Sequence, residues 1–489
     1  MATLNNTCVF CKCRVCSGIR STVDQIFQTL HIYGWMLDVY VVDFFQDNLW
    51  NRLPAVWRNF LEEITSEEIG KWILKESGSK RVWPLSLLAL RTFVESAEIC
   101  RDHRKECILK CSVNNYSNHN DLIKNLVKNK EPELSGIDVQ FNNIFKKRIK
   151  KKKKYEIDVI SQITADCAKI TNCECIVDIG AGMCHLSRIL AYKYNLNVIC
   201  VEQNELLLEN ARKWDEQLVA SLIKYIPDFC ERKSTYISLQ VGISSAERRQ
   251  LADRLTNIFI KDFNITNEKN GFGLVGLHPC GDLASTLLRL YSTDERARFI
   301  CIVGCCYMKL SLSERDEKGY PMSQYFAIKE YNNKLSYAAL EIACHALEKH
   351  CDKLKTNSYE DLKVHAYRAV LEYLLIEKNP NLRHTQLKNT KVKEDTTFKQ
   401  YCEIATQNLE LNNRPTDLDF ERTDVKNYLQ QWKRVLLFGS LRLLLAPLVE
   451  TLVLFDRFLY LSESNLSPSL KAQFDARFSP RNLLLISMK

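Results

Sequence analysis

A glycine-rich turn holds the residues best suited to bind a nucleotide-like ligand. Residues 175–187 read CIVDIGAGMCHLS, an apolar strand followed by an acid, two close glycines and the start of a helix. Gly180 permits a tight turn, and Gly182 lets backbone N–H groups approach a ligand that larger side chains would exclude. The next expected strand, Val198–Val201, ends in Glu202, whose carboxylate can accept both hydroxyls of a ribose. This spacing indicates a loop that binds a nucleotide-type cofactor.

Two cofactor classes compete for this turn. A dinucleotide site needs a third glycine at position 185, where this chain has His185. The shorter Asp-x-Gly-x-Gly pattern instead suits S-adenosylmethionine, which has no pyrophosphate to bind. A tight strand-to-helix turn in any α/β protein would look the same, so the turn alone leaves a purely structural role open.

A second group of reactive side chains follows the expected strand Gly273–Leu277. His278, Cys280 and Asp282 come directly after it, at a strand end of the kind where open α/β sheets bind ligands. His278 could act as a general base, and Asp282 could orient it or a target amine. Asp282 could equally cap the following helix, and both roles could coexist.

The expected strand Phe299–Val303 leads to Cys305, Cys306 and Tyr307. Its end should lie beside the end of the preceding strand, in the same crevice. Tyr307 could stack on a planar group of the substrate. The two adjacent cysteines could bind a metal or act as a nucleophile, but no second cysteine pair with zinc-like spacing is nearby, so we expect buried thiols.

Four more cysteines lie close together near the start of the sequence, at Cys8, Cys11, Cys13 and Cys16. Zinc ribbons leave a long loop between their two cysteine pairs, whereas one residue separates the pairs here, so a closed tetrahedral site from these four alone would be strained. We therefore predict that residues 1–17 form a flexible arm without a metal, with zinc or cluster binding as the lesser alternative.

The composition is that of a globular protein large enough for several domains. The chain has 489 residues, of which 46% are hydrophobic, and its twenty cysteines are unevenly spaced. Many of these cysteines lie in apolar runs, which favours reduced thiols and a cytosolic or nuclear protein over a disulfide framework. The N-terminal residues show no secretion signal.

The positive charge is concentrated in one place. Net charge is +9, and residues 146–154 contain eight cations in nine positions. This run could contact the phosphates of RNA or serve as a nuclear import signal, but charge runs are as often solvated linkers.

One long apolar stretch, Val435–Leu461, invites a membrane interpretation. Arg442, Glu450, Asp456 and Arg457 interrupt it, and each charge would cost about 3 kcal/mol near the bilayer centre. We therefore expect buried helices and no membrane span.

Along the chain, helical periodicity changes to alternating strands and helices at Tyr155. We expect an α/β core of parallel strands, with further strands near Tyr236–Val241 and at Leu483–Ser487. The predicted organisation is an arm (1–17), a helical N-terminal domain (18–135), a basic linker (136–154), the α/β core (155–310), and helical insertions with a final part of the sheet (311–489).

Together these residues resemble a family of methyltransferase-like proteins that includes methyltransferase-like protein 25 and the "ribosomal RNA adenine dimethylase domain-containing" proteins. The similar segments run through nearly the whole chain: Leu53-Pro54 with Trp57, then residues 153–157 (KKYEI), 177–182 (VDIGAG), 276–283 (GLHPCGDL), 304–307 (GCCY), 320–323 (YPMS), 365–369 (HAYRA), 445–450 (LAPLVE), 454–457 (LFDR) and 478–483 (FSPRNL).

The resemblance implies a class I, Rossmann-like methyltransferase core of seven strands, with S-adenosylmethionine as cofactor. It assigns the cofactor positions to Asp178, Gly180, Gly182 and Glu202. The core is also similar to a tRNA 2′-O-methyltransferase family that shares the histidine-cysteine-glycine step, which favours RNA as substrate. The Asn-Pro-Pro-Tyr type signature of true adenine dimethylases is absent.

We therefore predict a methyltransferase with His278, Asp282 and Tyr307 as catalytic residues and no metal in its active site. A protein side chain or a small metabolite is the alternative substrate. An inactive scaffold with a methyltransferase fold is a second hypothesis, supported by Cys184 and Met308, where members of the family commonly have glycine and histidine. A dehydrogenase is disfavoured because the third glycine is missing.

Overall fold

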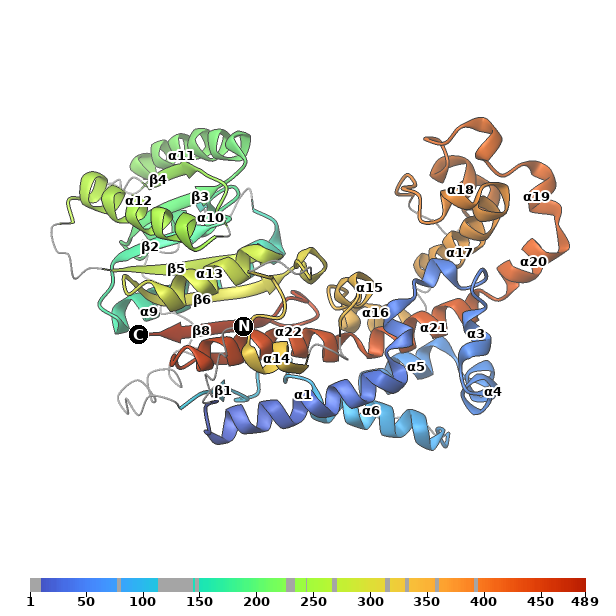
Figure 1. Cartoon of the computed structure of the whole chain (residues 1–489). Helices are drawn as coiled ribbons and strands as arrows, with labels where there is room; N and C mark the ends of the chain where they lie inside the picture. The colour runs from blue at the N-terminus through green and yellow to red at the C-terminus, as the bar shows by residue number, and fades with distance from the viewer. Residues whose placement is uncertain are drawn as a thin grey trace, which may run out of the picture. The chain divides into compact units, whose positions relative to one another are not determined.

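The chain folds into two compact units, each made of separate segments. The computed structural model describes residues 10–489 except 77–80, 113–143, 146–148, 226–233, 243, 266–270, 313–316, 330–333, 357–359 and 391–394. We call residues 1–25, 99–334 and 451–489 the α/β unit, and residues 26–98 and 335–450 the helical unit. Figure 1 shows the elements of both.

An eight-stranded sheet forms the centre of the α/β unit within the described residues, in the order β1-β7-β8-β6-β5-β2-β3-β4 (Figure 1). The pairs among β2 to β6 are parallel, whereas β8 runs antiparallel between β6 and β7. The strands are β1 (Leu109–Lys110), β2 (Cys175–Ile179), β3 (Asn197–Glu202), β4 (Thr235–Ser238), β5 (Phe272–Cys280), β6 (Ala297–Cys305), β7 (Ser469–Ala472) and β8 (Leu483–Met488). The predicted α/β core is confirmed, with the two-residue β1 added to seven longer strands.

Helices cover both faces of this sheet because its central strands are apolar on both sides. All five residues of β2 are buried, as parallel sheets require. The apolar core on one face joins Ile160, Ile189 and Leu208 from three helices to strand residues such as Val198. These helices are α9 (Lys151–Ile170), α10 (His185–Tyr192) and α11 (Glu205–Tyr225).

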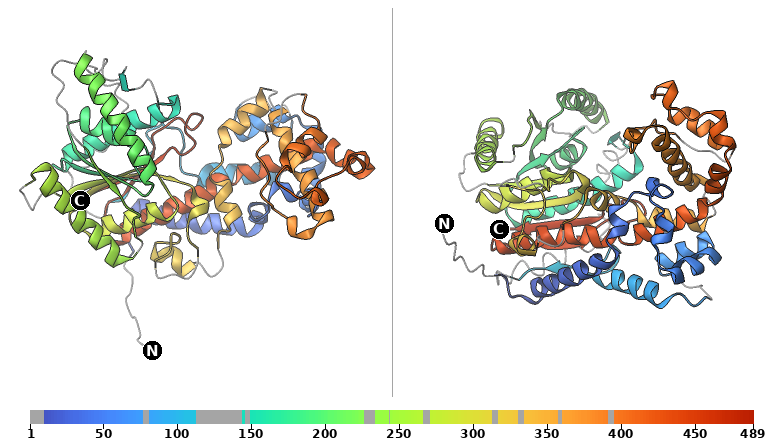
Figure 2. Two further views of the ribbon diagram at one scale, coloured as in Figure 1. Left: turned by 90° about the horizontal axis from the view of Figure 1, so that it is seen from above. Right: turned by 45° about the vertical axis from the view of Figure 1, so that its right-hand side comes forward.

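The other face carries α12 (Ser245–Phe263), α13 (Asp282–Thr293) and the part of α22 (Ala446–Glu463) that belongs to this unit. Figure 2 shows the sheet and its helices in two further views. Ser292 Oγ of α13 lies 2.8 Å from Tyr460 Oη of α22, and Tyr291 of α13 donates a hydrogen bond to Ser487 of β8. The C-terminal part of the chain thus adds α22 to this helix layer and β8 to the sheet.

The helical unit joins two groups of helices that are distant in sequence. The two groups pack closely against each other at Gly70 and Cys351. If Gly70 carried a side chain, its Cβ would lie only 2.9 Å from the carbonyl oxygen of Cys351. Its helices, apart from the end of α1 (Arg14–Tyr33) and the start of α22, are α2 (Trp35–Asp38), α3 (Leu49–Arg52), α4 (Ala55–Glu63), α5 (Ser66–Ile73), α6 (Leu85–Ala97), α15 (Tyr337–Ile342), α16 (Leu347–Lys355), α17 (Glu360–Lys378), α18 (Phe398–Ala405), α19 (Asp417–Glu421), α20 (Thr423–Gln430) and α21 (Trp432–Leu444).

Three predicted boundaries need correction. Residues 18–135 are not a domain, because residues 26–98 pack with residues 335–450. The flexible arm 1–17 is wrong from Arg14 onward, where α1 begins and buries Cys16, Ile19 and Val23 at helical spacing. In the basic run, Lys151–Lys154 form the first turn of α9 rather than a linker, while residues 146–148 lie outside the described residues.

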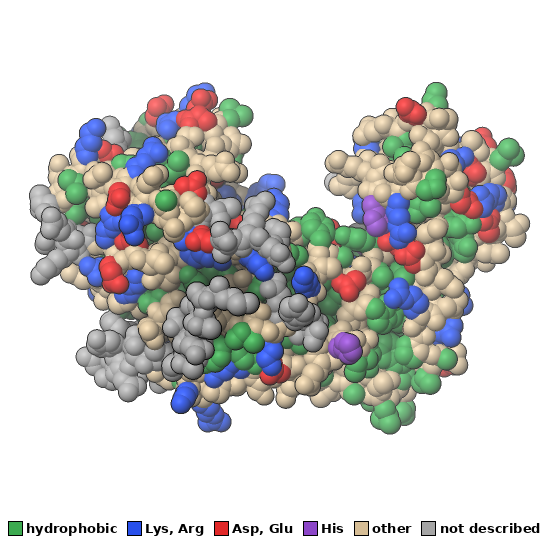
Figure 3. Space-filling model, viewed as in Figure 1, with side chains coloured by type: hydrophobic (Ala, Val, Ile, Leu, Met, Phe, Trp, Pro, Cys, Tyr) green, Lys and Arg blue, Asp and Glu red, His purple; other side chains and the backbone are tan. Residues whose placement is uncertain are grey.

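Charged side chains of both signs are interspersed on the surface of the α/β unit seen in Figure 3. The N-terminal cysteine Cys8 also lies outside the described residues.

One helical stretch, Trp432–Glu463, is apolar and long enough to cross a membrane by length and composition, and 94% of its most apolar window is buried inside the protein. Arg442 donates to the carbonyl oxygens of Met36, Leu37 and Ala338 at 3.0–3.2 Å. These contacts are typical of core helices.

Asp456 offers a test of this buried polar network. Its carboxylate accepts hydrogen bonds from the backbone N–H groups of Met322 and Ser323 and from the Ser323 hydroxyl, all at 2.8 Å. We expect Asp456→Ala to lower the free energy of unfolding by about 2–4 kcal/mol, because it leaves buried donors unpaired. Asp456→Asn keeps one acceptor oxygen and should cost less. Urea unfolding of the full chain measures both.

The matched control is Asp253→Ala, because Asp253 is a solvent-exposed partner of Arg296. Its effect should stay within about 0.5 kcal/mol. Equal losses from Asp456→Ala and Asp253→Ala would contradict the structural role of Asp456.

Candidate active site

The loop after β2 is held in a fixed path by its neighbour β3. The backbone N–H groups of Gly180 and Ala181 donate to the carbonyl oxygen of Val201 at 2.9 and 3.2 Å. Gly180 and Gly182 have φ values of +74° and +56°, which side-chain-bearing residues rarely adopt. A Cβ at Gly182 would meet no atom within 4 Å, so open space lies above the loop.

Glu202, the last residue of β3, connects the two strand ends. Its carboxylate accepts the N–H of Gly182 at 2.9 Å and the N–H of Asn204 at 3.1 Å. A carboxylate offers about four acceptor positions, so roughly two remain for hydroxyl groups of a ligand. The sequence-predicted pairing of the glycine turn with Glu202 is thus present in the structure.

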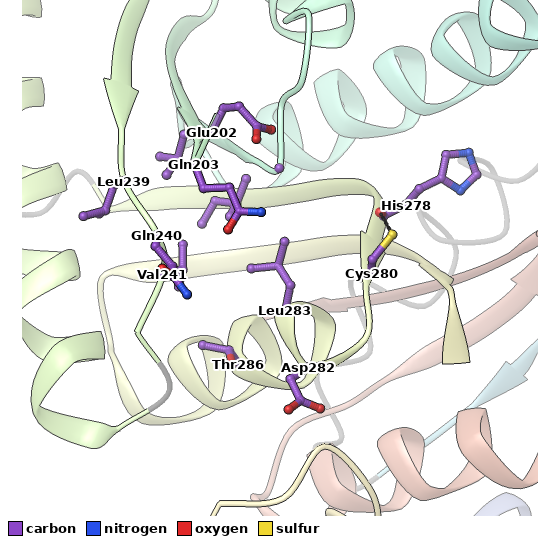
Figure 4. Close-up of a pocket in the computed structure, with 13 residues that line it drawn as sticks. Glu202, Gln203, Leu239, Gln240, Val241, His278, Cys280, Asp282, Leu283 and Thr286 are labelled. Carbon is purple, nitrogen blue, oxygen red and sulfur yellow. Dashed lines mark hydrogen bonds between the residues drawn. The ribbon is translucent and has the colours of Figure 1, made fainter. Parts of the chain in front are cut away.

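A cavity of about 340 Å³ opens at these strand ends (Figure 4). Its volume lies within the usual range for small-molecule sites. In Figure 4, the side chains of Glu202, Gln203 and Leu283 point toward it. It is lined by Ile179, Gly180, Val201, Glu202, Gln203, Leu239, Gln240, Val241, His278, Cys280, Asp282, Leu283 and Thr286.

Asp178 lies beneath the loop and does not line this cavity. Its side chain is buried and accepts a hydrogen bond from the Ser187 hydroxyl at 2.5 Å. Burial raises the pKa of Asp178 to about 6, although the bond from Ser187 opposes that rise. Asp178 therefore acts on the site through the loop and the first turn of α10, as a positioning residue.

Cys184 also stays out of the cavity. It is fully buried, adopts a positive φ of 55°, and packs in the apolar core beneath the sheet. Its thiol donates to the carbonyl oxygen of Gly182 at 3.6 Å. The residue that departs from the family pattern therefore does not narrow the cavity.

His278 lines the cavity, but its ring is turned away from the cavity centre (Figure 4). Its Nε2 lies 3.2 Å from Oε1 of the buried Glu156. Burial alone would lower the pKa of His278, but hydrogen bonding to Cys305 and Glu156 outweighs it and raises the pKa to about 9. The ring is thus protonated near neutral pH, which argues against the predicted role as a general base.

Asp282 begins α13, and its carboxylate accepts the backbone N–H of Ser311 at 2.8 Å. The cap position belongs to Gly281, and Asp282 makes no side-chain hydrogen bond to its own helix, so the capping alternative is wrong. Asp282 instead holds the chain after β6 against the cavity rim.

Tyr307 is buried, with 1% of its surface exposed, and it does not line the cavity. The guanidinium carbons of Arg457 and Arg481 each lie 5.7 Å from the centre of its ring. Because cations already occupy the ring environment and solvent is excluded, the predicted stacking on a substrate is contradicted.

Comparison with known proteins finds a methyltransferase domain and two similar proteins. Residues 151–313 match the family model described as "Methyltransferase domain". A Mus musculus protein named "Probable methyltransferase-like protein 25" is 28% identical over 325 residues, which are 60% of this chain and 53% of that protein. The Homo sapiens protein of the same name is 30% identical over 228 residues, 44% of this chain and 36% of the human protein.

The chain is similar to methyltransferase-like protein 25, and its residues 151–313 form a methyltransferase domain. The match spans about half the length of the mouse relative. No solved structure shows significant similarity to the chain. The methyltransferase domain of 151–313 contains α9 to α13 and β2 to β6, and therefore all residues that line the cavity.

Two features of this methyltransferase domain are absent from the sequence-based prediction. The first is the end of β4, where Leu239, Gln240 and Val241 line the cavity; the weak strand expected at Tyr236–Val241 was the available signal. The second is Arg188 of α10, which is fully buried.

Arg188 supports the loop from below. It donates a short hydrogen bond to the carbonyl oxygen of Met183 and pairs with Asp215 at 2.6 Å. Its guanidinium also lies 4.4 Å from the ring centre of Trp214. An arginine three residues after the helix start carries no distinctive sequence signal.

Glu156 is one of the two residues, with Cys305, that raise the pKa of His278. We expect Glu156→Gln to move the pKa of His278 from about 9 toward the ordinary value of about 6.5, because the paired charge is removed. Histidine NMR titration, assigned with His278→Gln, measures this shift. Glu209→Gln, an exposed acid on α11, is the matched control.

The same pair gives a pH dependence of stability. The folded pKa exceeds the unfolded value, so the stabilisation is complete below pH 6.5 and is lost as pH rises through about 9. We expect it to be about 1–2 kcal/mol, because a quarter of the His278 side chain is exposed. A wild-type unfolding profile as flat as that of Glu156→Gln would contradict the pairing.

Proposed function

We propose that this chain is an S-adenosylmethionine-dependent methyltransferase. The supporting observation is the cavity at the ends of β2 to β5, which Gly180 of the glycine turn and Glu202 both line. The matched methyltransferase domain supports methyl transfer, and the geometry supports this cofactor in particular.

The residues present fit S-adenosylmethionine better than a dinucleotide. Glu202 can accept ribose hydroxyls with its remaining lone pairs, and the space above Gly182 leaves room for a ligand against the backbone. The ring of His185 lies 5.0 Å from that of Trp214, edge to face, so position 185 is filled by packed side chains. A pyrophosphate would need bare backbone there.

When bound, S-adenosylmethionine supplies an electrophilic methyl group. The chain's own residues then have to hold the acceptor in line and exclude water, and such a transfer needs little covalent help. The cavity side formed by His278, Cys280 and Asp282 faces the acceptor in this proposal. The pairing of His278 with Glu156 fixes that strand end, and Asp282 fixes the chain that follows β6.

We propose RNA as the acceptor class. Lys151, Lys152 and Lys153 are exposed at the start of α9, where the basic run 146–154 leads into the domain. Backbone phosphates of RNA would pair with these cations. A cytosolic or nuclear location accords with this substrate and with fully buried thiols such as Cys200 and Cys301 in the sheet.

Binding of the cofactor is tested by calorimetric titration with S-adenosylmethionine. We expect Glu202→Gln to weaken binding by about 10–100-fold, because hydrogen bonds to a charged acceptor contribute about 1.5–3 kcal/mol. Glu205→Gln removes an exposed acid three residues away and should leave the affinity unchanged. The melting temperature of each variant reports on folding.

The outcome separates direct from indirect roles. Asp178→Ala should weaken binding and also lower the melting temperature, since Asp178 acts from below the loop. No binding by the folded native chain would overturn the cofactor proposal and leave an inactive scaffold.

The substrate class is tested with a radiolabelled methyl donor on RNA, protein and small-molecule fractions. We expect label in RNA, and we expect Lys151→Gln with Lys152→Gln to reduce the salt slope of RNA binding by about 2. Cofactor affinity should not change. Lys213→Gln, an exposed lysine on α11, is the control. Label confined to protein or small molecules would overturn the RNA proposal.

A further inference from the structure

Four cysteine sulfurs meet in the α/β unit, far from the cofactor cavity in sequence. The ligand atoms of Cys11, Cys13, Cys16 and Cys111 all lie within 4.8 Å of one another. Three of them come from the turn before α1 and its first residues, and the fourth directly follows β1. The sequence-based objection to a metal site, that the N-terminal cysteines are too close together, does not apply to a set completed by a distant residue.

The spacing of these sulfurs matches a single tetrahedral ion. Cys111 Sγ lies 3.6 Å from Cys16 Sγ, 3.7 Å from Cys11 Sγ and 4.0 Å from Cys13 Sγ. With a Zn–S bond of about 2.3 Å, a regular tetrahedron has sulfur–sulfur edges of about 3.8 Å. A disulfide would bring two sulfurs to about 2.05 Å. A four-iron cluster would hold them farther apart.

Hydrogen-bond donors lie next to these sulfurs. Backbone N–H groups of Cys13 and Cys16 donate to the sulfurs of Cys11 and Cys13 at 3.5 and 3.4 Å. The hydroxyl of Ser462 lies 3.2 Å from Cys16 Sγ and 3.5 Å from Cys111 Sγ. Such outer hydrogen bonds orient the ligands of metal sites.

A positive charge lies beside the cluster. Arg20 donates to the carbonyl oxygen of Cys11 at 2.8 Å. Four thiolates around one divalent ion carry a net charge of about −2, so a neighbouring guanidinium is favourable. Cys16 and Cys111 are fully buried, which shields the ion from solvent.

We propose that Cys11, Cys13, Cys16 and Cys111 bind one structural zinc ion. All four thiolates are protein ligands, so the site is closed and has no open position for a substrate. The ion joins two chain segments that residues 26–98 separate in sequence, residues 10–25 and the segment around β1. Ser462 at the end of α22 contacts the cluster through its hydroxyl.

Two other groups of candidate ligands are weaker. Cys280, Cys305 and Cys306 supply only three sulfurs within the described residues, and Cys280 is exposed. In the helical unit, Asp43, Glu372 and His384 come together, but Arg383 already pairs with Asp43 at 3.0 Å and would repel a cation.

Metal analysis of the full chain, purified without chelator, tests the proposal. We expect about one zinc per chain, with four sulfur neighbours at about 2.3 Å by X-ray absorption. Cys111→Ser should lower the zinc content by roughly fivefold or more, because a three-sulfur site binds far more weakly. Cys107→Ser is the matched control, since Cys107 lies outside the cluster and its thiol is exposed.

Cys111→Ser removes a buried group and can therefore unfold the unit whether or not zinc is bound there. The X-ray absorption spectrum of the native chain is the second measurement for this reason. Iron in place of zinc, a disulfide between these cysteines, or a folded native chain that takes up no supplied zinc would each overturn the proposal. S-adenosylmethionine binding is measured on the same samples, so failure here is distinguishable from failure of the cofactor proposal.

Discussion

The parallel pairing of β2 with β3 is the constraint on which the candidate active site depends. Its register sets Asp178 opposite Cys200 and Ile179 opposite Val201, so the glycine turn and Glu202 emerge side by side. The turn then donates to both the backbone of Val201 and the carboxylate of Glu202. A slip of one residue would send Glu202 to the other face of the sheet and remove this contact.

Much of the central sheet was predictable because its strands are short apolar runs between turn signals. The predicted strands Cys175–Ile179, Phe299–Val303 and Leu483–Ser487 are confirmed, the last two with extensions of one to two residues at their ends. β7 was missed because Ser469–Ala472 reads SLKA, a mixed sequence whose burial comes from its partners. Short strands of this kind are fixed by tertiary context rather than by propensity.

Within the site, sequence spacing identified contacts between neighbouring strand ends but not contacts across long separations. Gly182 and Glu202 meet because consecutive parallel strands place their ends together. The partner of His278 is Glu156 on α9, which no local pattern indicates. Hydrophobic periodicity likewise finds the helices on either side of the α/β core, but it does not show that they pack into one unit.

The placement of β8 has a consequence for the order in which the chain folds during synthesis. β8 fills the position between β6 and β7, so the edge of β6 stays unpaired until residues 483–488 have left the ribosome. By then both segments of the helical unit, 26–98 and 335–450, have emerged. An open apolar strand edge invites pairing with other chains. The α/β core therefore closes only after the helical unit has been translated.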